Sequence, residues 1–162
     1  CERWRPNTVL TFPGSPAAFK AVYQFTDASL LARALLWGSE NPACANQAFN
    51  ITNGEYDRWE NIWPAIADCF GMKPGPVQTI SLARFMADKE PLWARICENH
   101  GLKPYRMQDL VKWDFVDWVY AAAFDQMSSL SKIRRAGWNE TLDAETMFRR
   151  LFGKLRSERI IP

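Results

Sequence analysis

The chain has 162 residues, of which 48% are hydrophobic and 14% aromatic, enough for one compact core and too few for two large ones. Twenty Lys and Arg residues oppose eighteen Asp and Glu residues, and the formal charge of +2 is spread along the chain. A nucleic-acid partner is disfavoured, because it would require a basic patch or stripe. No apolar run approaches the roughly 20 residues that cross a bilayer, and nothing resembles a signal peptide, so we expect no membrane partner and a cytoplasmic location.

The four cysteines and the single histidine give little sign of metal or redox chemistry. Cys69 and Cys97 lie in apolar helical stripes, where a free cysteine behaves as a small hydrophobic residue, and no pair has the spacing of a metal site. Two disulfides in a secreted protein are the weaker interpretation. His100 stands at an apparent helix end without a recognisable partner, so we expect it to complement the helix dipole rather than to act as a base.

The first part of the chain predicts two short strands and a helix. The strands are expected at WRPNTV (4–9) and AVYQF (21–25), on either side of the turn FPGSP (12–16). Asp27 can cap the helix that follows at 28–40. The apolar side chains of this helix predict an inward stripe of Leu30, Leu31, Ala34, Leu35 and Trp37.

The middle of the chain predicts a strand at AFNIT (48–52), a turn at Asn53-Gly54 and a helix from Asp57 to Phe70. Pro64 removes a backbone hydrogen bond from this helix, so we expect a kink there or a later start. The segment GMKPGPVQ is expected to be a loop. Two helices follow at 79–89 and 90–100, and Gly101 ends the second.

The last part of the chain is predicted to be helical. A crowded apolar helix is expected at 107–124, a short helix at 128–138 that Gly137 stops, and an amphipathic helix at 141–162. The predicted strands are too few for an independent sheet, so we expect them to lie at the edge of something larger. The predicted fold class is therefore a mainly helical α+β chain with a few short strands.

The sequence contains no visible active site. It lacks the glycine-rich turn of a dinucleotide site and a phosphate-binding loop, and none of its tyrosines has a lysine four positions later for proton donation. Asp114 and Asp117 are paired carboxylates, but helix capping and solvation explain them better than acid–base catalysis. We therefore expect no catalytic, cofactor-binding or metal-binding residue in this chain.

The order of the motifs resembles the C-terminal half of extended short-chain dehydrogenases/reductases, and most closely the progesterone 5β-reductase and iridoid synthase-like group with its bacterial members. The matching motifs cover nearly all of the chain: RPNTV, FPGSPAAF, FTDASLLARALLW, NQAFNITNGEYDRWENIWPAIADCFG, LARFMADKEPLWARICENHGL, WDFVD, SLSKIRRAGW and SERIIP. The resemblance implies an α/β parent with a Rossmann domain, in which RPNTV and AFNIT are late strands of the nucleotide-binding sheet. Residues 1–162 would be the C-terminal substrate-binding portion, without the N-terminal cofactor-binding half.

The resemblance also implies a reaction and two site residues. In that group NADPH reduces the carbon–carbon double bond of an enone or enal, and a tyrosine stabilises the developing enolate. Phe115 matches the pocket aromatic residue of the family's WWF motif, and Trp113 matches its first tryptophan, whereas Asp114 replaces the second. Both Phe115 and Trp113 are thus expected to bind substrate. Packing in the core is the alternative role for Phe115.

The implied partners are a small apolar carbonyl substrate and a second copy of the chain in a homo-oligomer. NADP(H) would be the cofactor of the longer parent enzyme, and none is expected for this chain alone, which would be inactive by itself. The alternative function is a free-standing helical module, derived from such an enzyme, that self-associates through the former interdomain surface.

Overall fold

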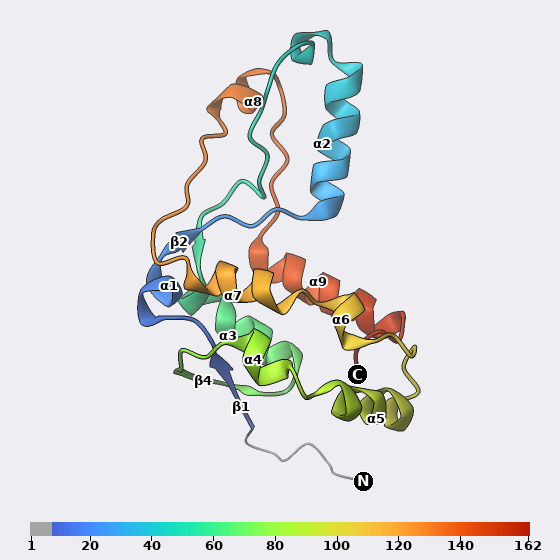
Figure 1. The fold of residues 1–162 in the computed structure, drawn as a ribbon. Coiled ribbons are helices and arrows are strands. Elements are labelled where there is room, and N and C mark those ends of the chain that lie inside the picture. The colour runs from blue at the N-terminus through green and yellow to red at the C-terminus, as the bar shows by residue number, and fades with distance from the viewer. Residues whose placement is uncertain (1–7) are drawn as a thin grey trace.

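The computed structural model describes residues 8–162, which are mostly helical (Figure 1). Within this range, β1 (Val9–Phe12) lies parallel to β4 (Lys73–Val77), and β2 (Val22–Tyr23) lies antiparallel to β3 (Asp57–Arg58). The helices are α1 (Pro16–Lys20), α2 (Ala28–Glu40), α3 (Trp59–Cys69), α4 (Leu82–Met86), α5 (Glu90–His100), α6 (Met107–Leu110), α7 (Trp113–Ala121), α8 (Ser131–Arg135) and α9 (Ala144–Ser157), with a short 3-10 helix at Pro42–Cys44. The predicted mainly helical class with a few short strands is confirmed.

The main core is rich in aromatic rings and lies where β1, α1, α3 and α9 meet. Phe12 is fully buried, and its ring centroid lies 5.1 Å from that of Trp63 and 5.0 Å from that of Tyr120. Trp63 also donates its indole N–H to the carbonyl oxygen of Leu10 at 2.8 Å, which joins α3 to β1. The buried residues of this main core are Phe12, Ala18, Phe25, Trp59, Ile62, Trp63, Ile66, Ala144 and Met147. Such ring pairs contribute roughly 0.5–1.5 kcal/mol each beyond their apolar burial.

A second core lies between α2 and α8, which stand apart from the other helices at the top of Figure 1. It consists of Leu30, Ala34, Leu130, Ile133 and Trp138. Leu142 packs against both cores and therefore joins them.

Helix α2 has the bounds that the sequence predicts, but its buried stripe is narrower. Leu30 and Ala34 are buried, whereas Leu31 is 36% and Leu35 62% exposed. The difference arises because α2 packs on only one side, toward α8 (Figure 1). The apolar side chains at the edge of the predicted stripe have no neighbouring helix to cover them and stay exposed.

Two predictions about strands were wrong. The segment 48–52 is not a strand, because no other strand pairs with it among residues 8–162 and a strand needs a partner for its backbone groups. The expected loop GMKPGPVQ contains β4, because β1 supplies a partner. Prolines at 74 and 76 are tolerated there since β4 has a single neighbour. The strand predicted at 4–9 falls largely outside the described residues, and β1 begins at its last residue, Val9.

The predicted helix at 107–124 was also wrong, because it is two helices, α6 and α7, separated at Val111 and Lys112. The two are held by different neighbours. The backbone N–H of Met107 in α6 donates to Glu90 of α5 at 3.0 Å, whereas α7 packs against α4. The backbone is extended at Val111 (φ −135°, ψ 133°) and at Lys112 (φ −97°, ψ 91°), which interrupts the helix between these two anchors.

Helices α3 and α5 have bounds close to the predicted ones, whereas α4, α8 and α9 are shorter than the helices predicted at 79–89, 128–138 and 141–162. α3 begins at Trp59, two residues later than predicted, and keeps Pro64 inside. α5 ends before Gly101, whose φ of 61° is the left-handed conformation that a C-terminal glycine favours. Local punctuation therefore predicts these helices well.

Candidate functional site

Helix α7 presents two aromatic rings to solvent. The side chains of Phe115 and Trp118 are 62% and 64% exposed, and their ring centroids lie 5.8 Å apart with 26° between the ring planes. Residues three positions apart share one helix face, so the rings stack side by side. We call them the α7 aromatic pair. Phe124 and Met127, which follow α7 in the chain, are also 65% and 63% exposed. Such exposed apolar surface is typical of a binding site.

The structure places the two predicted site residues differently. Phe115 is on the open face of α7, so the alternative in which its ring packs in a core does not hold for this chain. Trp113 is the first residue of α7 and is half-buried. Their role in substrate binding stays a prediction. Trp118 was not predicted as a site residue, although its i,i+3 spacing from Phe115 was a signal that could have identified it.

The α7 aromatic pair lies outside two open hollows on the surface of residues 8–162. One hollow, of about 340 Å³, borders Gly54, Met127 and Arg134, and another, of about 380 Å³, lies along α5. Neither is lined by Phe115 or Trp118. The pair is therefore a platform, which needs a second body to enclose a ligand.

The opposite side of α7 is anchored in the main core through Tyr120. Its ring centroid lies 5.0 Å from that of Phe12 and 5.1 Å from that of Trp59. Burial, with a smaller contribution from Tyr23, raises the pKa of Tyr120 to about 12. Its phenol therefore keeps its proton at neutral pH, and its packing is that of a core residue.

The carboxylate of Asp117 caps helix α4. It accepts hydrogen bonds from the backbone N–H groups of Leu82 (2.7 Å) and Ala83 (3.1 Å) and from the hydroxyl of Ser81 (2.9 Å). Burial by itself would raise the pKa of Asp117, but these three hydrogen bonds outweigh it and hold the pKa below its ordinary value. The predicted capping role is confirmed for Asp117, although the helix that it caps is α4 rather than its own.

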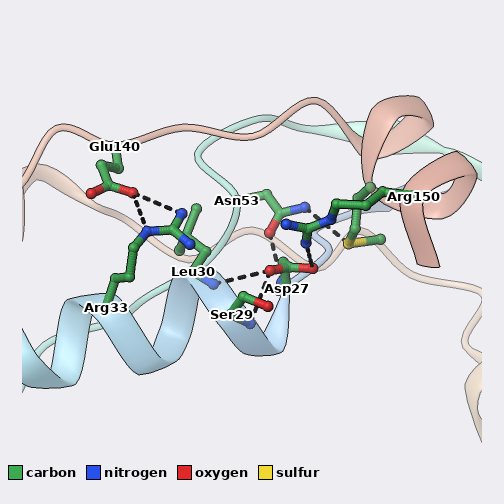
Figure 2. Close-up of polar contacts among 8 residues, drawn as sticks. Asp27, Ser29, Leu30, Arg33, Asn53, Glu140 and Arg150 are labelled. Carbon is green, nitrogen blue, oxygen red and sulfur yellow. Dashed lines mark hydrogen bonds and ion pairs between the residues drawn. The ribbon is translucent and has the colours of Figure 1, made fainter. Parts of the chain in front are cut away.

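A second polar cluster, shown in Figure 2, joins α2 to α9. Asp27 caps α2 by accepting from the backbone N–H groups of Ser29 (2.9 Å) and Leu30 (3.0 Å), and it also accepts from the guanidinium of Arg150. The buried amide of Asn53 accepts from the backbone N–H of Asp27 at 2.7 Å. Burial would raise the pKa of Asp27, but the bonds from Arg150 and the α2 backbone lower it overall. Every one of these groups is engaged within the chain, which is typical of a structural junction.

The described residues offer no metal site. No group of three or more His, Cys, Asp or Glu side chains could hold an ion in residues 8–162. Cys44, Cys69 and Cys97 are free thiols, and burial raises the pKa of Cys97. His100 is exposed in the last turn of α5, as expected for a residue that complements a helix dipole. None of the helices described in residues 8–162 is both long and apolar enough to cross a membrane.

No family model matches the chain. It is 30% identical over 161 residues to an (S)-8-oxocitronellyl enol synthase of Nepeta cataria, a match that covers 96% of this chain and 40% of the relative. An enzyme of the same name from Catharanthus roseus is 29% identical over 160 residues, with 96% of this chain and 41% of the relative covered. A short chain dehydrogenase of Penicillium aethiopicum is 32% identical over 150 residues, with 83% of this chain and 40% of the relative covered.

The chain thus spans about 40% of the length of the curated relatives that it matches. The resemblance inferred from the motifs is confirmed: the homologues of this chain are iridoid synthase-like (S)-8-oxocitronellyl enol synthases and a short chain dehydrogenase, and it corresponds to one portion of such proteins.

Proposed function

We propose that residues 1–162 are the C-terminal, substrate-binding portion of a cytoplasmic NADP(H)-dependent short-chain oxidoreductase that reduces the C=C bond of an enone or enal. The names of the relatives support this reaction, because they describe an enol synthase and a short chain dehydrogenase. An enol forms when a hydride adds to the β-carbon of an enal and the carbonyl oxygen gains a proton. Reduction of an enone or enal by the progesterone 5β-reductase-like route begins with that step.

The α7 aromatic pair is the observation that carries the proposal. Phe115 and Trp118 form an apolar platform that is more than 60% exposed and lies outside both hollows described above. In the longer protein, the cofactor-binding portion would close over this platform and complete a pocket for a small apolar carbonyl compound. Trp113, at the start of the same helix, would border that pocket.

The residues of this chain would hold the substrate rather than transfer hydride. None of the described helices follows a glycine-rich phosphate-binding turn, so the dinucleotide does not fit this chain alone and would bind the other portion. The apolar rings would exclude water from the developing enolate, where a hydrogen-bond donor from the other portion acts more strongly. The unpaired segment 48–52 supports this division, since in the parent it would join the nucleotide-binding sheet.

The test uses the complete natural protein with NADPH and two enones, one bulky and one small. The wild-type protein should oxidise NADPH only when an enone is present. Phe115→Ala should change the ratio of the two kcat/KM values by about tenfold, or about 1.4 kcal/mol of differential transition-state binding. The matched control is Phe85→Ala on α4, which removes a ring of similar exposure, 57%, and should leave the ratio unchanged. No enone-dependent oxidation of NADPH in the wild type would refute the proposal.

Self-association is the second candidate function, and the exposed apolar side chains of α2 favour it. Leu35 and Leu36 are 62% and 61% exposed on a helix that packs on one side only. Such surface can pair with a second copy of the chain. Sedimentation of the 162-residue chain should then depend on concentration, and Leu35→Glu should abolish this dependence. A monomer at all concentrations would contradict it.

A further inference from the structure

Helix α7 combines an exposed outer face with an inner face that is tied to three other parts of the chain. None of its nine residues is buried, yet Tyr120 enters the main core, Asp117 caps α4, and the carbonyl oxygen of Tyr120 passes close to Gly14. A helix that is only loosely covered needs such ties to keep one orientation.

We infer that Asp117 is the positioning residue of the proposed site, because its carboxylate fixes the rotation of α7 that presents Phe115 and Trp118. The inference rests on the proposed function in so far as the α7 aromatic pair contacts substrate. The orientation of α7 itself can be measured without it.

The helical positions support this assignment. Successive residues turn by about 100°, so Asp117 lies about 200° from Phe115 and about 100° from Trp118, while the two rings are about 60° apart. When the carboxylate points to α4, Phe115 must therefore point away from α4, and Trp118 must point to one side of it. A rotation of α7 that buried either ring would take Asp117 off the end of α4.

The hydrogen bonds give this contact a strict direction. Both carboxylate oxygens of Asp117 are used, Oδ1 by Leu82 N–H and Oδ2 by Ala83 N–H and Ser81 Oγ–H. The Ser81 oxygen in turn accepts from the N–H of Arg84 at 3.3 Å, so Asp117 completes the cap of α4. Charge-assisted bonds of this kind are shorter and more directional than contacts between apolar side chains. Tyr120 anchors α7 in the main core, and the three bonds of Asp117 add a directional contact that fixes which face of the helix turns toward α4.

Asp114 offers a matched control on the same helix. Its side chain is exposed, and none of the hydrogen bonds found in residues 8–162 involves its carboxylate. Removing it changes the charge of α7 by the same amount as removing Asp117 and leaves the α4 contact in place.

The experiment is ¹⁹F NMR on the complete natural protein labelled with 5-fluorotryptophan. Trp118→Phe and Trp138→Phe assign the signals of α7 and of the second core. We expect Asp117→Ala to shift or broaden the Trp118 signal while the Trp138 signal stays in place, and Asp114→Ala to move neither. Asp117→Asn, which keeps the shape but loses the charge, should give a smaller change in the same direction. These measurements need no substrate.

The paired enone assay then tests the consequence for selectivity. Asp117→Ala should change the ratio of kcat/KM for bulky and small enones by roughly threefold, less than Phe115→Ala, because it displaces the rings without removing them. If Asp117→Ala lowers the melting temperature but leaves the Trp118 signal unchanged, Asp117 only caps α4 and the inference is wrong. If Asp117→Ala does not fold, the Asp117→Asn comparison decides in the same way. The two results can also differ. If Asp117→Ala shifts the Trp118 signal but the wild-type protein reduces no enone, the role of Asp117 in orienting α7 is supported and the proposed function is refuted.

Discussion

Helices α3 and α7 are both rich in tryptophan and aliphatic residues, but they are used in opposite ways. In α3, Trp59 and Trp63 are 6% and 5% exposed and four further residues are buried, whereas α7 has no buried residue and exposes Phe115 and Trp118. The difference lies in their neighbours. Helix α3 packs against α9, β4 and α1, whereas α7 packs mainly against α4. Similar composition can therefore build a core in one place and a candidate binding surface in another.

The largest expected effect on the free energy of unfolding is in the buried helix, α3. Trp63→Ala removes ring contacts with Phe12 and the hydrogen bond to Leu10, and it should lower the free energy of unfolding by about 3–5 kcal/mol. Urea denaturation followed by circular dichroism measures this change. Trp63→Phe, which keeps an aromatic ring but not the indole N–H, should lose less. A loss below 1 kcal/mol for Trp63→Ala would show that α3 is not part of the stabilising core.

An intermediate effect is expected at the junction of α2 and α9, and it depends on pH. The folded pKa of Asp27 is below its ordinary value of 3.8, so the stabilisation by its carboxylate is complete at neutral pH and is lost as the pH falls below about 4, through the folded pKa. Asp27→Asn should cost about 1 kcal/mol near pH 7, typical of a lost helix cap.

Urea midpoints of the wild type and of Asp27→Asn, measured from pH 7 to pH 2.5, test this prediction. The two curves should converge at the acid end, because the wild-type carboxylate then becomes protonated. Glu140→Gln, which removes an exposed ion pair with Arg33, is the control and should give only a small difference throughout this pH range (Figure 2). A gap between wild type and Asp27→Asn that widened at low pH would mean that the sign of the pKa shift is wrong.

The smallest expected effect on the free energy of unfolding is in the exposed helix, α7. In the 162-residue chain, Phe115→Ala should change the free energy of unfolding by less than about 0.5 kcal/mol, since the ring is 62% exposed. The same urea experiment measures it. A loss of several kcal/mol would mean that Phe115 is covered in solution, either by another portion of the protein or by a second copy of the chain.

Most helix positions were predictable because their signals are local. Asp27 caps α2 two and three residues away, and Gly101 ends α5 with a conformation that few other residues adopt. The strands were less predictable, since β4 exists only because β1 lies beside it, and 48–52 is not a strand for want of such a neighbour. A strand depends on a partner that its own residues do not specify.

The sequence alone determined the mainly helical class and the helix caps. Through the order of its motifs it also determined the resemblance to iridoid synthase-like reductases, and with it Phe115 as a candidate site residue. Only the tertiary structure decided that Phe115 faces solvent, that Trp118 stacks on it, and that Asp117 caps a helix 35 residues away. The physical reason is that a periodic pattern identifies which residues share a helix face, whereas burial, stacking and capping across the chain depend on which other element lies against that face.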